Sequence, residues 1–398
     1  MRIIFISSTC SPKHYEEICN KRKYAILDSS QKFFDMFLKG FKNRNDIEIE
    51  CICVAPLSHG TYPDLVIKER EEKLGNINYY SVSFINYTGI KSITAGFRVK
   101  KRLKEIIARK NDKTVIVTDP LLLEATVPAL KVGKKFGIQV IGFLTDLPDF
   151  ADQCDELGFI KTVLYKRYNK KSAKCLAEFN KYVFLTEAMS KAVNGNNRPW
   201  LLMECLVDCY AVDGGQKKNQ TDKPSVMYAG KLHKQFGLDI LAKAIEKVKS
   251  DCRFDIYGDG NFRGELEKIA DKNKNVFIHG IVPVAEVMQA ERNSTLLINP
   301  RMSNGEFTKY SFPSKTAEYM LSGTPVLMFK LPGIPDEYDN YLNYAKNETA
   351  DSLALEIDRL LERGNDILTE KGESARRFII ENKNNITQAE RFIEFCLK

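Results

Sequence analysis

The residues with the clearest chemical pattern follow a short apolar run in the second half of the chain. Residues 225–228 are expected to form a strand, and Gly230 and Lys231 come just after it, before a helix that starts near Gly237. Glycine lets the backbone approach an anion closely, and a helix N-terminus attracts negative charge. Lys231, with Lys234 nearby, supplies a neutralising cation. The pattern is typical of a diphosphate site, and equally of solvated lysines at a loop–helix junction.

Two further strand ends in this half carry glycine in the same way. Gly258 and Gly260 follow a predicted strand at 253–257, and His279-Gly280 follows one at 276–278. A glycine at such a position permits the close approach of a base or a ribose. These loops are therefore candidates for the nucleoside part of the same ligand.

A helix predicted at 314–322 supplies a second set of polar groups. Ser314 is expected to cap it, so that the backbone amides near 313–315 face a bound phosphate or sugar. Glu318, about one turn into the helix, can accept two hydrogen bonds from a ribose diol. Anion binding and ribose binding are thus expected from one helix.

The elements that must position these residues alternate along the chain. Strands are predicted near 2–6, 48–54, 77–80, 114–117, 139–143, 182–185, 225–228, 253–257, 276–278, 295–298 and 325–328. Helices are predicted near 29–43, 95–110, 122–136, 160–177, 187–193, 237–249, 262–273 and 314–322. This α/β order is typical of parallel sheets with crossover helices.

A polar, glycine-bearing stretch at 208–223 interrupts this order and is typical of an exposed linker or long loop. We therefore expect a first domain at 1–207, a second at 224–384 and a terminal helix at 385–398 that packs near the first domain. Two open parallel sheets joined in this way place a cleft at their strand ends, where ligands usually bind.

The composition narrows the class of protein. It is 43% hydrophobic and 28% charged, as in globular enzymes. No run reaches the roughly 18 apolar residues of a membrane span, and the start lacks a signal-peptide cleavage pattern. The ten cysteines form no CxxC pair and are expected to be buried free thiols. These features predict a cytoplasmic protein.

The formal net charge of +8 is concentrated in two basic blocks, at 98–104 and 166–171. Each block fits a solvated helix face, a contact with an anionic membrane surface, or a nucleic-acid contact. Because lipid-linked acceptors are expected below, a peripheral position on the inner face of the membrane is the interpretation carried forward, with no nucleic acid as partner.

Four motifs occur in order: AGKL at 229–232, IYGDG at 256–260, HGIV at 279–282 and FPSKTAEYMLSGTPV at 312–326. The series resembles the retaining GT-B glycosyltransferases of family 4, most strongly over 224–345. The resemblance implies the GT-B fold, with two Rossmann-like parallel-sheet domains facing a cleft and a C-terminal helix that returns to the first domain.

The resemblance also implies roles. Gly230 and Lys231 would bind the diphosphate, and Glu318 would hold the ribose as the second glutamate of an E-x7-E pattern. The first glutamate is replaced by Tyr310, while Lys315 adds a second cation near the leaving diphosphate. The donor-binding set is Gly230, Lys231, Lys234, Gly258, Gly260, Ile281, Val282, Tyr310, Phe312, Pro313, Ser314, Lys315 and Glu318, with Ile281 and Val282 beside the base.

In the first half, Asp146 ends a predicted strand before Pro148. Aspartate and proline at this spacing are common in turns. The functional alternative is a carboxylate that orients the acceptor hydroxyl. Asp146, Lys231 and Lys315 are the catalytic candidates.

The expected reaction moves a sugar from a nucleoside diphosphate, a UDP-sugar in preference to a GDP-sugar, to a saccharide or lipid-linked acceptor. Surface-polysaccharide synthesis in bacteria is the expected setting. Retention follows from the resemblance, and no cofactor or metal is expected because lysines can neutralise the leaving group. The alternatives are an epimerase-like or phosphorylase-like protein of the same fold, a basic nucleic-acid-binding protein, and a binding module that has lost activity through Tyr310.

Overall fold

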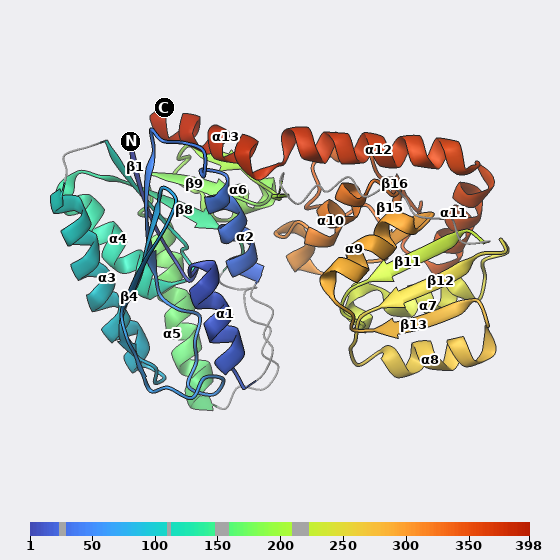
Figure 1. Ribbon diagram of the computed structural model, residues 1–398, viewed down its shortest axis with the longest axis horizontal. Coiled ribbons are helices and arrows are strands. Elements are labelled where there is room, and N and C mark those ends of the chain that lie inside the picture. The colour runs from blue at the N-terminus through green and yellow to red at the C-terminus, as the bar shows by residue number, and fades with distance from the viewer. Residues whose placement is uncertain (24–28, 110–112, 148–158, 209–222) are drawn as a thin grey trace. The chain divides into compact units, whose positions relative to one another are not determined.

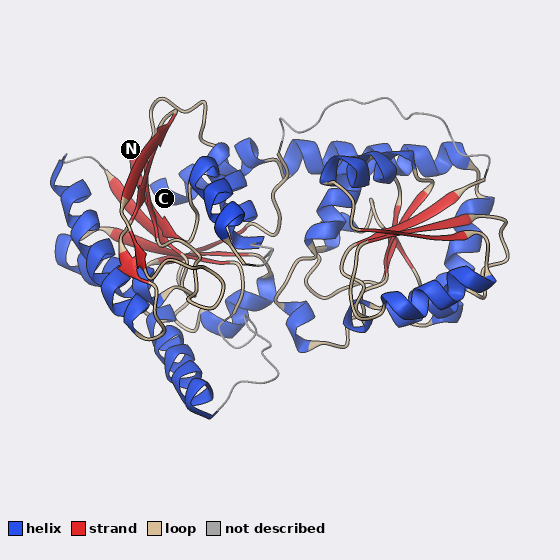
Figure 2. Cartoon of the chain, turned by 60° about the horizontal axis from the view of Figure 1, so that its bottom comes forward, coloured by secondary structure: helices blue, strands red, loops and turns tan. Residues whose placement is uncertain are grey.

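The computed structural model describes residues 1–23, 29–109, 113–147, 159–208 and 223–398 (Figures 1 and 2). The chain forms two compact units. Unit 1 comprises Met1–Leu206 and Asn385–Lys398, and unit 2 comprises Val207–Asn384. Most of the predicted linker, residues 209–222, lies outside the described residues.

Unit 1 is built on a mostly parallel sheet whose central strands are buried on both faces. All six residues of its strand β1 are buried, as expected when helices cover both faces of a sheet. The order across the described sheet is β10 (Trp200–Leu202), β9 (Lys181–Phe184), β8 (Gln139–Leu144), β7 (Thr114–Thr118), β1 (Arg2–Ser7), β2 (Glu48–Cys53), β5 (Ile77–Ser81) and β4 (Arg70–Leu74). Neighbouring strands are parallel except β4 and β5, which pair antiparallel.

Helices flank this sheet, as Figure 2 shows. They are α1 (Pro12–Lys21), α2 (Ser29–Lys39), α3 (Ile90–Arg109), α4 (Leu123–Phe136), α5 (Phe159–Leu176) and α6 (Glu187–Val193). A short antiparallel pair, β3 (Val66–Ile67) and β6 (Phe84–Ile85), lies apart from the main sheet.

The terminal helix α13 (Asn385–Leu397) belongs to unit 1, although it follows the whole of unit 2 in the sequence. The ring of its Phe392 lies edge-on to Phe37 of α2, 5.3 Å between centroids. Gly40 accepts the helix closely, because a Cβ there would lie 2.1 Å from the carbonyl oxygen of Asn385. The last helix therefore completes the core of the first unit.

Unit 2 holds a fully parallel sheet in the order β13 (Val276–Gly280), β12 (Arg253–Tyr257), β11 (Ser225–Ala229), β14 (Leu296–Asn299), β15 (Val326–Met328) and β16 (Asn343–Tyr344). Its α-helices are α7 (Leu238–Ile245), α8 (Arg263–Lys272), α9 (Val284–Asn293), α10 (Ser314–Ser322), α11 (Ala350–Glu362) and α12 (Asn365–Asn382). Three 3₁₀ turns, η1 (Lys234–Phe236), η2 (Glu306–Lys309) and η3 (Asp336–Tyr338), join them.

The prediction of an α/β chain with two Rossmann-like parallel-sheet domains is confirmed. Several elements went unpredicted, among them α1, α9, α11, α12 and the edge strand β4. The sequence of β4, Arg-Glu-Glu-Lys-Leu, is too polar to be recognised as a strand. It is held by pairing with β5 and by ion pairs of Arg70 with Glu17 and of Glu71 with Arg102. None of the described helices is long and apolar enough to span a bilayer.

Candidate functional site

The carboxyl ends of β11, β12 and β13 are joined by backbone hydrogen bonds at one edge of the sheet of unit 2. The Gly230 amide donates to Tyr257 O (3.0 Å), and the Gly258 amide donates to Gly280 O (2.7 Å). The Leu232 amide then donates to the carbonyl oxygen of Asp259 (2.9 Å). Three predicted ligand-binding loops thus form one continuous backbone surface.

Glycine is required where these loops cross. Gly258 has a φ of +124°, and a Cβ on it would lie 1.8 Å from the carbonyl oxygen of Gly230. A Cβ on Gly260 would lie 2.4 Å from Leu232 O. The backbones therefore approach more closely than any side chain allows, which also leaves their outer surface open to a ligand.

Gly258→Ala is expected to destabilise unit 2 by about 3 kcal/mol, because the methyl group displaces the Gly230 loop and the residue keeps a left-handed backbone. Gly264→Ala is the matched control. It lies in α8 with nothing within 4 Å of its Cβ position, and should be neutral or stabilising by up to about 1 kcal/mol. Thermal and urea unfolding measure both variants; equal stability of the two would contradict the crowding of Gly258.

The three lysines predicted to lie near the diphosphate differ in their environment. Lys231 and Lys234 are exposed, and neither forms an ion pair within the described part of the chain. Lys315 is more constrained, because its Nζ lies 2.8 Å from Glu318 Oε2 and 3.9 Å from the buried Glu291 Oε1. Lys315, predicted to lie near the diphosphate, and Glu318, predicted to bind the ribose, therefore form an ion pair with each other in the structure without ligand.

Tyr319 attaches α10 to the end of β11. Its hydroxyl accepts a hydrogen bond from the Ala229 amide (2.8 Å) and donates one to Ala229 O (3.1 Å). Ala229 directly precedes Gly230 and Lys231. The contact brings the helix that carries Lys315 and Glu318 to the edge that carries the first glycine loop, and sequence reasoning did not assign this role.

The prediction that Ser314 caps α10 was wrong. The N-cap is Pro313, with φ −73° and ψ 106°, and Ser314 is the first helical residue. Proline holds its backbone extended by fixing φ, and it has no side-chain oxygen to offer. No side chain caps this helix, and of its first amides that of Thr316 donates to Pro313 O (2.8 Å).

The remaining donor-binding candidates lie in different surroundings. Phe312 is buried against Tyr338, with 5.3 Å between ring centroids, and Pro313 is also buried. Tyr310 is half-buried directly after η2, and its amide donates to Phe307 O (3.0 Å). Ile281 is 80% exposed after β13, with half-buried Val282 next to it.

In unit 1, Asp146 lies half-buried just after β8. Asp119 directly follows the neighbouring strand β7 and is buried. Burial raises the pKa of Asp119 to about 7, against the hydrogen bond from the Leu121 amide and with help from the charges of Glu124 and Asp146. Sequence reasoning missed Asp119, although Thr118-Asp119-Pro120 repeats the pattern that singled out Asp146.

The stability of the protein should depend on this carboxyl group. The folded protein holds the Asp119 proton more tightly than the unfolded chain does, so the free energy of unfolding should fall as the pH rises from about 4 to about 7. Asp119→Asn keeps an acceptor for the Leu121 amide and removes the titration. Its urea unfolding should vary less over this range than that of the wild type. The exposed Asp271→Asn is the control; identical slopes in wild type and Asp119→Asn would refute the assignment.

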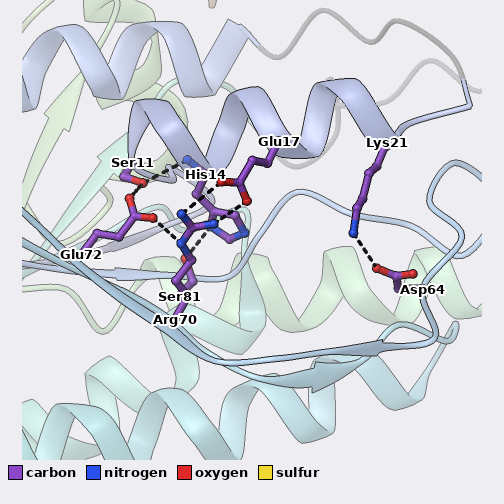
Figure 3. A network of polar contacts seen from close by, with 8 residues as sticks. All are labelled: Ser11, His14, Glu17, Lys21, Asp64, Arg70, Glu72 and Ser81. Carbon is purple, nitrogen blue, oxygen red and sulfur yellow. Dashed lines mark hydrogen bonds and ion pairs between the residues drawn. The ribbon is translucent and has the colours of Figure 1, made fainter.

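A cavity of about 780 Å³ opens in unit 1 between α1 and the segment that follows β2. Figure 3 shows a polar network beside it, in which Arg70 lies between Glu17 and Glu72; His14, Glu17 and Arg70 of this network line the cavity. His14 Nδ1 lies 2.9 Å from Ser81 Oγ, and burial followed by the charge of Arg70 lowers its pKa. Imidazole, carboxylate and guanidinium groups together suit a polyhydroxylated ligand better than a simple ion.

Two parallel-sheet, Rossmann-like units in one chain are the architecture of GT-B glycosyltransferase structures, and this chain shares it. Residues 223–363, which include the glycine loops and α10, match the family model described as Glycosyl transferases group 1. An uncharacterized glycosyltransferase from Methanocaldococcus jannaschii is 26% identical over 152 residues, covering 36% of this chain and 37% of that relative. The matched segment thus covers little more than a third of the length of that relative.

Solved structures resemble the chain over its whole length. A sucrose-phosphate synthase from Thermosynechococcus elongatus has a TM-score of 0.65 at 13% identity, covering 99% of this chain and 98% of that chain. The Anabaena protein HepE in complex with UDP has a TM-score of 0.64 at 13% identity, covering 99% of both chains. A UDP-forming α,α-trehalose-phosphate synthase from Burkholderia xenovorans, in complex with glucose-6-phosphate, has a TM-score of 0.66 at 10% identity and covers 100% of both chains. At these identities the likeness shows the fold.

Proposed function

We propose that this chain is a glycosyltransferase that moves a sugar from a nucleoside-diphosphate donor to a saccharide or lipid-linked acceptor. One observation carries the proposal: Tyr319 holds the helix with Lys315 and Glu318 at the same sheet edge as Gly230 and Lys231. Cations, free helix amides and a carboxylate there match the parts of a nucleoside diphosphate. The glycosyl transferases group 1 match over 223–363 supports it.

Unit 2 is proposed to act by electrostatic stabilisation of the leaving diphosphate. The bond between the sugar C1 and the diphosphate oxygen breaks, and its electron pair leaves with the nucleoside diphosphate. Lys231, Lys315 and the first amides of α10 neutralise the charge that develops. The acceptor hydroxyl oxygen bonds C1, and its proton passes to the departing diphosphate. We propose that this reaction needs no metal and retains the anomeric configuration.

Unit 1 is proposed to bind the acceptor. Its cavity of about 780 Å³ is large enough for a saccharide, and its charged wall offers both donors and acceptors to hydroxyl groups. Asp146, half-buried just after β8, is the carboxyl group of unit 1 proposed to orient the attacking hydroxyl.

The donor is tested by screening sugar nucleotides with UDP, GDP, ADP and dTDP for thermal stabilisation, with and without EDTA. We expect a UDP-sugar to raise the unfolding temperature most, and EDTA to leave the shift unchanged. A preference for a GDP-sugar would change the predicted base of the donor and leave the rest of the proposed function in place. Absence of stabilisation by every sugar nucleotide would overturn the proposed function, while binding without turnover of any acceptor would indicate a module that has lost activity.

A further inference from the structure

The outward face of α3 is unusually apolar for a helix whose inner face is already buried. Ala95, Val99, Leu103 and Ile106 pack inward. On the opposite side, the first turns expose three large apolar side chains in succession: Ile90 is 43%, Ile93 74% and Phe97 67% exposed. Their spacing of three and four residues places them on one stripe. The helix is thus apolar on both sides at its N-terminal half. Figure 1 shows α3 at the margin of unit 1, beside α4.

The short antiparallel pair of β3 and β6, whose second strand leads into α3, extends this apolar surface. Val66 and Ile85 pair across β3 and β6, and they are 62% and 37% exposed. The Ile85 amide donates to Thr94 Oγ1 of α3 (3.2 Å), and the Ile90 amide donates to Tyr87 O (3.1 Å). These bonds hold the β3–β6 pair beside the first turns of the helix. Exposed apolar residues that gather in this way mark an interaction surface.

Lysines continue the same stripe toward the C-terminal half of the helix. Lys100, Lys101 and Lys104 are exposed and follow Phe97 at helical spacing. The nearest carboxylate to Lys101 Nζ is that of Glu105, at 3.9 Å. A stripe that is first apolar and then cationic matches the chemistry of an anionic bilayer, where side chains enter the acyl boundary and lysines contact the headgroups.

The second basic block, on α5, differs in the position of its aromatic residue. Its aromatic residue Tyr168 is held inside unit 1, where the hydroxyl donates to Leu121 O (2.7 Å) and accepts from the Leu123 amide (2.9 Å). No stacking or inserting side chain is therefore offered by Tyr168. From the sequence, the same three interpretations applied to both basic blocks. The structure distinguishes the blocks.

We propose that the α3 face, defined by Ile90, Ile93, Phe97, Lys100, Lys101 and Lys104, binds the surface of an anionic lipid bilayer. Ile93 and Phe97 insert below the headgroups, and the lysines lie over them. Val66 and Ile85 of the β3–β6 pair extend the contact. This surface would bind lipid whether or not the chain transfers sugar, so the two proposals stand or fall separately.

Sedimentation with vesicles tests the proposal on the full chain. Wild type should bind vesicles of equal parts phosphatidylglycerol and phosphatidylcholine, bind pure phosphatidylcholine weakly, and detach as salt is raised. Ile93→Glu with Phe97→Glu should lower the partition coefficient about 100-fold. Lys100, Lys101 and Lys104 changed together to Gln should lower it by a similar factor, since each lysine near the surface contributes about fivefold.

Leu355→Glu is the matched control, because Leu355 is 70% exposed on α11 of unit 2 and should leave binding unchanged. Thermal unfolding of each variant verifies that the fold persists. Equal binding of wild type and the double glutamate variant would overturn the proposal. So would a wild-type dimer that the double variant converts to a monomer without any vesicle binding, because the face would then be an interface between two copies of this chain.

Discussion

Lys231→Ala is expected to lower kcat for sugar transfer by about 100- to 1,000-fold, the usual cost of removing one preorganised charge from a developing oxyanion. Lys231 is exposed at the first glycine loop and forms no ion pair among the described residues, so its charge is available to the leaving diphosphate. The measurement is the rate of nucleoside diphosphate release with the best donor from the screen. Lys231→Arg should recover part of the loss, since it restores the charge with a different geometry.

Lys243→Ala is the control for this experiment. Lys243 is an exposed lysine of α7 in the same unit, and its removal changes the net charge equally. A loss of the same size in both variants would show that only the overall charge matters. A Lys231→Ala variant with wild-type kcat would remove Lys231 from the catalytic candidates.

Glu318→Ala is expected to weaken UDP binding about 100-fold, because two hydrogen bonds from the ribose hydroxyls to a carboxylate are lost. The loss should appear with UMP as well as with UDP, since both carry the ribose. Lys231→Ala, in contrast, should weaken UDP much more than UMP if it contacts the terminal phosphate. Isothermal titration of the two nucleotides against the two variants measures the four affinities.

Glu318→Ala also breaks the ion pair with Lys315, so its control must do the same elsewhere. Glu265→Ala removes an equivalent pair with Lys268, three residues apart at 2.8 Å on α8. Exposed pairs of this kind contribute little to stability, about 0.3–0.5 kcal/mol. Nucleotide affinity should be unchanged in Glu265→Ala. Unchanged affinity in Glu318→Ala would refute its role as the ribose-binding residue.

Much of the fold was predictable because parallel strands buried on both faces leave short β-branched runs in the sequence. The strands predicted at 2–6 and 253–257 are observed as β1 (Arg2–Ser7) and β12 (Arg253–Tyr257). The helix predicted at 95–110 begins earlier, at Ile90. Its first turns were missed because their apolar residues lie on the outer side, so the inward periodicity used for the prediction is absent there. That same irregularity is what marks the α3 face.

The candidate site divides in a similar way. Gly258 was predictable as a point of close approach, since few other reasons place glycine directly after a buried strand. The role of Tyr319 was not, because its hydroxyl meets a backbone ninety residues away in sequence. Asp119 was missed for the same kind of reason: its raised pKa comes from burial, and burial is a property of everything that packs around it.

The sequence by itself determined the alternation of strand and helix, the places where glycine must stand, and the types of charged residue available at each strand end. These are local properties, set by side-chain period and backbone freedom. Only the tertiary structure decided that Tyr319 ties α10 to the end of β11, that Asp119 is buried, and that Ile93 and Phe97 face outward. Each of these depends on contacts between segments far apart in the chain, which no local pattern encodes.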